Sequence, residues 1–146
     1  DEAELLREMR DGRLAKGLYT VLFYKLFASV VMREYTVAIV VAEKLQELSE
    51  FWNSYFPRYL AWVLEGLSLL FRSKKTKKKR EHRRARSILR KMKKSAKEGC
   101  PNWTPMILLL EAVDFSIDKG RCGDDVAQMF DAAVETASAT NLRHIE

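Results

Sequence analysis

The chain has 146 residues, of which 47% are hydrophobic and 10% are aromatic, enough apolar surface for the core of one ordinary domain. This composition excludes a disordered tail. The net charge of +6 is unevenly distributed, because residues 72–98 carry fifteen Lys or Arg and two Glu, while the remainder carries eleven basic and eighteen acidic residues.

The first two predicted elements are helices. Residues 2–11 have the pattern of the end of an amphipathic helix that Gly12 terminates, so the helical array is expected to begin before this segment. A helix over 13–32 is apolar on nearly all sides, which is typical of a helix packed between neighbours. We therefore expect it to be central.

A third helix is predicted over 35–49, after a short connection at Arg33 and Glu34 that favours a hairpin. Its apolar residues lie on one stripe: Ala38, Val41, Ala42, Leu45 and Leu48. The small side chains of Ala38 and Ala42 allow a neighbouring helix to approach closely.

The next two helices differ sharply in charge. The first, over 54–72, begins at Ser54 as N-cap with Pro57 in its first turn. Its predicted buried stripe comprises Tyr59, Leu60, Val63, Leu64, Leu67, Leu70 and Phe71. The second, over 77–97 with Thr76 as its cap, keeps a thin apolar seam at helical spacing: Ala85, Ile88, Leu89, Met92 and Ala96.

Two further helices complete the chain. Thr104 and Pro105 indicate the start of a helix over 105–119, and Asp124 or Asp125 opens the last helix, over 124–140. The last helix is expected to bury Val126, Ala127, Phe130, Ala133, Val134 and Ala137. No segment alternates with the period of two that a strand requires.

These helices form three pairs, over 13–49, 54–98 and 105–140, and no pair can bury both of its faces alone. The sequence therefore predicts an all-α fold, an α-solenoid of antiparallel hairpins. Residues 1–146 are interpreted as a single helical-repeat segment and as a fragment of a longer chain.

Two motifs carry a family resemblance. Residues 35–42 and 120–133 each resemble the second-helix signature of tetratricopeptide repeats, in which an aromatic residue and small residues recur at helical spacing. The residues at the signature positions are Tyr35, Ala38 and Ala42 in the first motif and Gly120, Val126, Phe130 and Ala133 in the second. Val126 stands where the family usually has alanine, and one extra residue near Cys122 departs from its spacing.

A longer pattern is more specific. Residues 108–112, Gly120, 130–134 and 141–144 together are similar to the degenerate repeats of large multidomain signalling ATPases and hybrid histidine kinases. In those proteins the repeats link a nucleotide-binding module to other domains. The resemblance implies a scaffold with no catalytic residue in this segment.

One feature could carry a specific binding activity. The basic helix repeats cations at intervals of three or four residues, which defines a candidate interaction ridge: Arg83, Arg86, Arg90, Lys93, Lys94 and Lys97. Such a ridge could neutralise the phosphates of nucleic acid or an acidic membrane surface. Against nucleic acid, no aromatic residue lies between Ser73 and Pro101 to stack on bases. A solvated outer helix is the simplest explanation of the charge, an acidic protein partner is the next, and nucleic acid is the least favoured.

The residue pattern gives no indication of a catalytic site, a cofactor site or a metal site. His82 and His144 are isolated, Cys100 and Cys122 have no metal-ligand spacing, and no Gly-rich phosphate loop is present. The longest apolar stretch, 18–32, contains Lys25 and is shorter than the roughly 20 apolar residues needed to cross a bilayer. No secretory signal pattern opens the chain, so a cytoplasmic protein is expected.

The sequence thus predicts a non-catalytic helical-repeat scaffold that mediates protein–protein or interdomain interactions within a larger signalling protein. The alternative is a basic adaptor that binds nucleic acid or an acidic membrane surface through the 77–97 helix.

Overall fold

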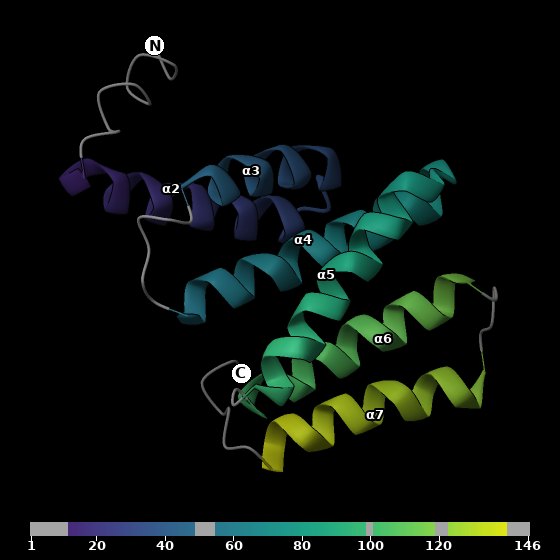
Figure 1. Cartoon of the computed structure of the whole chain (residues 1–146). Coiled ribbons are helices and arrows are strands. Elements are labelled where there is room, and N and C mark those ends of the chain that lie inside the picture. The colour runs from purple at the N-terminus through teal and green to yellow at the C-terminus, as the bar shows by residue number, and fades with distance from the viewer. Residues whose placement is uncertain (1–11, 49–54, 99–100, 119–122, 140–146) are drawn as a thin grey trace. The chain divides into compact units, whose positions relative to one another are not determined.

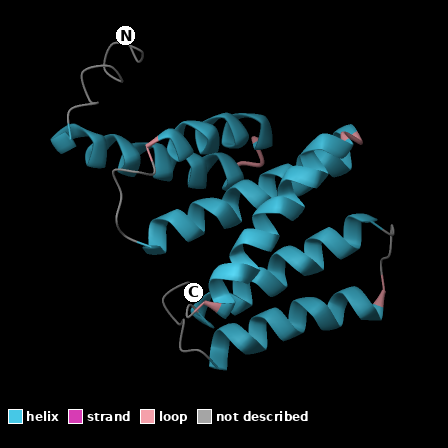
Figure 2. Ribbon diagram, in the orientation of Figure 1, coloured by secondary structure: helices cyan, strands magenta, loops and turns pink. Residues whose placement is uncertain are grey.

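The computed structural model describes residues 12–48, 55–98, 101–118 and 123–139, and within these ranges the chain is all-helical, without strands. Figures 1 and 2 show this succession of helices. The α-helices are α2 (Gly12–Val31), α3 (Tyr35–Glu47), α4 (Tyr55–Thr76), α5 (Lys79–Lys97), α6 (Thr104–Asp118) and α7 (Asp124–Ala139). A short 3₁₀ helix, η2 (Pro101–Trp103), precedes α6. The all-α prediction is confirmed.

The chain divides into two compact units, residues 1–68 and 69–146, and the division falls within α4. Unit 1 contains α2, α3 and the first part of α4. Unit 2 contains the end of α4 and the helices that follow. Each unit is described separately below.

In unit 1, α2 and α3 pack against each other as an antiparallel hairpin (Figure 1). The turn is closed by backbone bonds from Glu34 N–H to the Ser29 carbonyl at 2.8 Å and from Arg33 N–H to the Val30 carbonyl at 3.0 Å. This pair of bonds is a Schellman motif, and Arg33 takes the left-handed conformation that it requires, with φ of 61°.

The core of unit 1 is a cluster of buried side chains from α2, α3 and α4. Its members from α3 and from Leu48, which follows α3, include every residue of the predicted stripe, so that prediction is confirmed. From α2 and α4 the cluster takes Leu18, Tyr19, Leu22, Leu26, Ala61 and Leu64. Burial of apolar area on this scale is the main stabilising contribution to such a unit.

The prediction that α2 is the central helix is wrong. Val21, Tyr24 and Val31 are each more than 60% exposed, so α2 buries only one side. The helix buried on nearly all sides is α4, where eight of the ten residues from Ala61 to Leu70 are buried, including Glu65 and Ser68. An all-apolar sequence does not by itself specify how many neighbours a helix has.

In unit 2, the two residues Lys77 and Lys78 join α4 to α5. Lys77 has φ of 59°, and its N–H donates to the Ser73 carbonyl at 2.7 Å, which closes the last turn of α4. The predicted capping role of Thr76 is wrong, because Thr76 belongs to α4 and its hydroxyl donates to the Arg72 carbonyl. The residue preceding α5 is Lys78, which makes no side-chain capping bond.

The remaining helices of unit 2 follow the predicted boundaries closely. The helices α6 and α7 pack against each other as an antiparallel pair, and α5 contacts α6 (Figure 1). The predicted burial of α7 is wrong in part, since only Ala133 is buried while Ala127 and Val134 are exposed. Much of the predicted apolar stripe of helix α7 is therefore exposed to solvent.

Several predicted features lie outside the described residues. They are the helix over 2–11, the Ser54 cap, both cysteines, Gly120 and His144.

Candidate interaction groove

Helix α5 presents its cations because its apolar residues occupy one narrow face. Ala85, Ile88 and Met92 are buried at helical spacing, and Leu89 and Ala96 are half-buried, as the sequence predicted. Basic residues fill most of the other positions, so the helix is strongly amphipathic. The buried face fixes the rotation of α5 and therefore the direction of every charged side chain on it.

Arg86 and His82 converge on one carboxylate of α6. Arg86 Nε lies 2.9 Å from Oδ2 and 3.2 Å from Oδ1 of Asp114, and His82 Nε2 contacts the same Oδ1. The Asp114 side chain is only 15% exposed. A carboxylate with this degree of burial is stabilised by donors on two successive turns of the neighbouring helix.

A second ionic contact joins the same helices further along. Lys93 Nζ pairs with Glu111 Oε1, one turn before Asp114 on α6. Two of the cations predicted to form a solvent-facing ridge are thus bound within the unit. Their positive charge is partly neutralised, and they hold α5 against α6.

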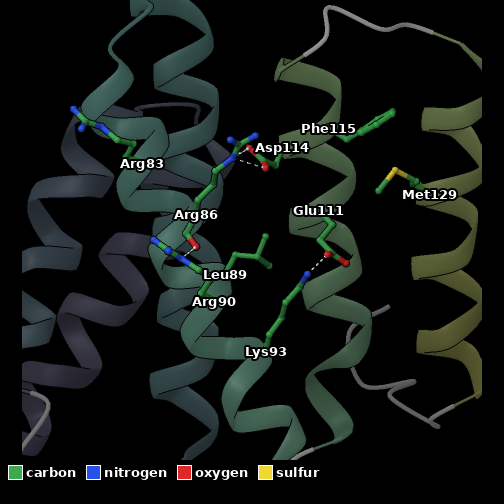
Figure 3. A pocket seen from close by; sticks show the side chains of 9 residues that line it. All are labelled: Arg83, Arg86, Leu89, Arg90, Lys93, Glu111, Asp114, Phe115 and Met129. Carbon is green, nitrogen blue, oxygen red and sulfur yellow. Dashed lines mark hydrogen bonds and ion pairs between the residues drawn. The ribbon is translucent and has the colours of Figure 1, made fainter.

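Between these contacts the surface of unit 2 is hollowed into an open groove of about 560 Å³ (Figure 3). Its lining comprises Arg83, Arg86, Leu89, Arg90 and Lys93 of α5, Glu111, Asp114 and Phe115 of α6, and Met129 of α7. We call this site the groove. Figure 3 shows Phe115 and Met129 approaching each other from α6 and α7, and Leu89 reaching from α5 toward α6.

The six predicted ridge residues therefore have different surroundings. Arg83 and Arg90 are exposed at the groove, and Arg90 Nε donates weakly to the Arg86 carbonyl at 3.4 Å. Lys94 pairs with Glu98 at 3.7 Å, in an exposed contact one turn apart. Lys97 is exposed at the end of α5. The structure brings four of the six together at one groove.

Sequence reasoning did not identify the other wall of the groove. Glu111, Asp114, Phe115 and Met129 come from helices far along the chain, and no motif connects them with α5. One signal was present, because the acidic residues 111 and 114 are spaced by three and face a helix rich in cations.

The predicted repeat-packing positions that the structure describes lie on α3 and α7. Ala38 and Ala42 are buried in the α2–α3 hairpin, and Tyr35 is half-buried at the start of α3. On α7, Ala133 is buried, and Val126 and Phe130 are half-buried. Small residues therefore occupy the most closely packed of these positions, as helix pairing requires.

Unit 1 contains a separate buried polar cluster that sequence reasoning missed. Gln46 Nε2 donates to Glu65 Oε2 at 2.5 Å, and Glu65 is 1% exposed. Burial raises the pKa of Tyr19, against the opposing charge of Arg58, which lines the same cavity. This cavity of about 20 Å³ holds one water molecule at most, so it is too small for a substrate.

Neither a metal site nor a membrane span is visible in the described part of the chain. No three His, Cys, Asp or Glu residues gather there in a way that could hold a metal ion. Among the same residues, no helix has the length and apolar character to cross a bilayer.

Comparisons of the chain with known protein families, with characterised proteins and with solved structures give no match. The functional interpretation accordingly depends on the residues and geometry described above.

Proposed function

We propose that this chain is part of a tetratricopeptide-like helical-repeat scaffold that binds another protein, or joins domains, within a larger cytoplasmic signalling protein. The observation that carries the proposal is the groove, because it combines three half-buried apolar side chains with charges of both signs. Protein interfaces have this composition, with an apolar centre and a polar rim.

The size of the groove suits a short segment of a partner. A volume of about 560 Å³ is within the range of ligand sites, and the groove runs along helices, as do grooves that accept an amphipathic helix. Leu89, Phe115 and Met129 would contact apolar side chains of that segment. Arg83 and Arg90 would favour carboxylates at its edge.

The chemistry of the groove favours binding over catalysis. Its lining contains no Ser, Thr or Cys nucleophile, and its two carboxylates are bound to Lys93 and to Arg86 with His82. These contacts hold the helices together. Recognition by shape and charge requires no covalent step.

The repeat character of the proposal is supported by the apolar face that the α2–α3 hairpin leaves exposed. Its residues are Val21, Tyr24, Phe27, Val31 and Met32 of α2 and its C-terminal end, and Val37 and Val40 of α3, all between 39% and 74% exposed. A hairpin in a solenoid buries such a face against the next repeat. The exposed stripe on α7 has the same explanation.

The proposal is tested by selecting peptide ligands from an unbiased displayed library and titrating them against three forms of the chain. The groove variant, Phe115→Ala with Met129→Ala, should weaken binding by about tenfold or more, because it removes the apolar centre. The control, Val37→Ala with Val40→Ala, removes exposed apolar groups from α3 and should bind like the wild type. Ligands that bind both variants equally would contradict the assignment.

A further inference from the structure

A second charged surface lies outside the groove, at the turn from α4 to α5. Six of the seven residues from 74 to 80 are cations, and all six are exposed: Lys74, Lys75, Lys77, Lys78, Lys79 and Arg80. We call this surface the basic turn. It differs from the ridge of α5 in having its charges concentrated at one end of the helix.

The acidic residue that directly follows the basic turn in the sequence, Glu81, faces inward. Glu81 is 7% exposed, and its Oε1 accepts a hydrogen bond from Arg72 Nη2 at 2.9 Å. Its other oxygen lies 3.4 Å from the Thr76 hydroxyl, and Lys78 Nζ is 4.0 Å from Oε1. In the part of the chain that the structure describes, no carboxylate forms an ion pair with Lys74, Lys75 or Lys79.

The positions of residues 77–80 are unfavourable for the folded chain itself, whereas Lys74 and Lys75 lie in the last turn of α4, where the helix dipole favours cations. Lys78 precedes α5 without a capping side chain, and Lys79 and Arg80 lie in the first turn, where the helix dipole is positive. Lys77 also adopts the left-handed conformation, which is costly for a residue with a side chain. Residues whose placement lowers the stability of the fold in this way are expected at functional sites.

We propose that the basic turn binds an anionic lipid surface. Five of its six cations are lysines, which are compact, strongly hydrated charges and attract an acidic membrane without requiring a defined partner geometry. The charges are concentrated in a two-residue turn and its flanks, a compact arrangement that suits a plane of lipid headgroups. This binding site is separate from the groove and does not depend on the proposed scaffold function.

A nucleic acid backbone is the less suitable polyanion. Cations spaced along α5 would follow a duplex, but two of them, Arg86 and Lys93, are paired with Asp114 and Glu111. Aromatic side chains that stack on unpaired bases are absent between Ser73 and Pro101. The exposed cations are therefore more densely spaced at the turn, with six in residues 74–80, than along the rest of α5.

The experiment measures sedimentation of the 146-residue chain with phosphatidylcholine vesicles that contain about one third phosphatidylserine. The turn variant replaces Lys74, Lys75 and Lys79 with Gln. Each cation near the surface contributes about a fivefold increase in affinity, so this variant should bind roughly 100-fold more weakly. Pure phosphatidylcholine vesicles should bind neither form.

The control variant, Lys91→Gln with Lys94→Gln and Lys97→Gln, removes the same charge from the other end of α5 and should retain vesicle binding within a few-fold. The turn variant should unfold within a few degrees of the wild type, because it removes the unfavourable charge of Lys79 at the start of α5 as well as the favourable charges of Lys74 and Lys75 at the end of α4. Equal loss of vesicle binding in both variants, or tighter binding of the wild type to a duplex RNA or DNA than to the acidic vesicles, would overturn the proposal.

Discussion

Glu81 of α5 accepts a hydrogen bond from Arg72 of α4, with 2.9 Å between Oε1 and Nη2, and this contact bridges the turn that carries the greatest positive charge. The bond lowers the pKa of Glu81 below its ordinary value of 4.5, assisted by the charges of Arg72 and Lys78 and by Thr76, while burial acts in the opposite direction. The contact orients the beginning of α5 against the end of α4.

The first prediction concerns pH. Because the folded chain favours charged Glu81, the contact stabilises the fold above pH 4.5 and is lost as the pH falls through the lowered pKa. Glu81→Gln should reduce the free energy of unfolding by about 1–2 kcal/mol near neutral pH. Thermal unfolding followed by circular dichroism should show this difference shrinking below pH 4.5. A difference that stays constant down to strongly acidic pH would contradict the assignment.

The second prediction concerns the contact between α5 and α6. Asp114→Asn removes the negative charge that His82 and Arg86 share, and should destabilise the chain by about 1–3 kcal/mol in urea denaturation. Glu98→Gln is the matched control, because its exposed pair with Lys94 contributes less than about 0.5 kcal/mol. Similar effects of the two substitutions would show that the Asp114 contacts do not hold these helices together.

The third prediction separates the two faces of α2. Leu26 is fully buried in the core of unit 1, and Leu26→Ala should reduce stability by about 3 kcal/mol. Val21 lies on the exposed face, at 61% exposure, and Val21→Ala should cost less than about 0.5 kcal/mol. Chemical denaturation of both variants checks which face is inside, and the reverse order of effects would mean that α2 is rotated.

The fourth prediction compares glycine substitutions at two positions, which should change the stability of the chain in opposite directions. Arg33→Gly should stabilise the chain by about 1 kcal/mol, because glycine takes the left-handed conformation of this turn without steric cost. Lys25→Gly should destabilise it by about 1 kcal/mol, because Lys25 is inside α2. Melting temperatures that fall in both variants would exclude the Schellman turn at Arg33.

The positions of the helices could be predicted from the sequence because helix-capping residues, helix-breaking residues and hydrophobic periodicity are local signals. Gly12, the Arg33–Glu34 connection, Thr104 and Asp124 each lie within one or two residues of an observed helix boundary. The buried stripe of α3 was also predictable, since most residues between its members are polar, although Ile39 is buried outside the predicted stripe. These signals depend on neighbours one turn away in the same helix.

The errors concern contacts between helices. The apolar pattern of α2 suggested burial on all sides, whereas α4 has that environment and even buries Glu65. Periodicity describes a helix surface but does not specify which surfaces meet. For the same reason the candidate ridge on α5 was predictable, but its pairing with Glu111 and Asp114 and the resulting groove were not.

The central claim, that the chain binds a protein segment in the groove, is tested most directly by the salt dependence of the dissociation constant of a selected peptide. Contacts with Leu89, Phe115 and Met129 are apolar, so the slope of log affinity against log salt should be shallow, about −1 or smaller in magnitude. The groove variant should bind more weakly at every salt concentration. A slope of about −4 or steeper, as for several phosphate contacts, with no effect of the groove variant, would contradict the claim.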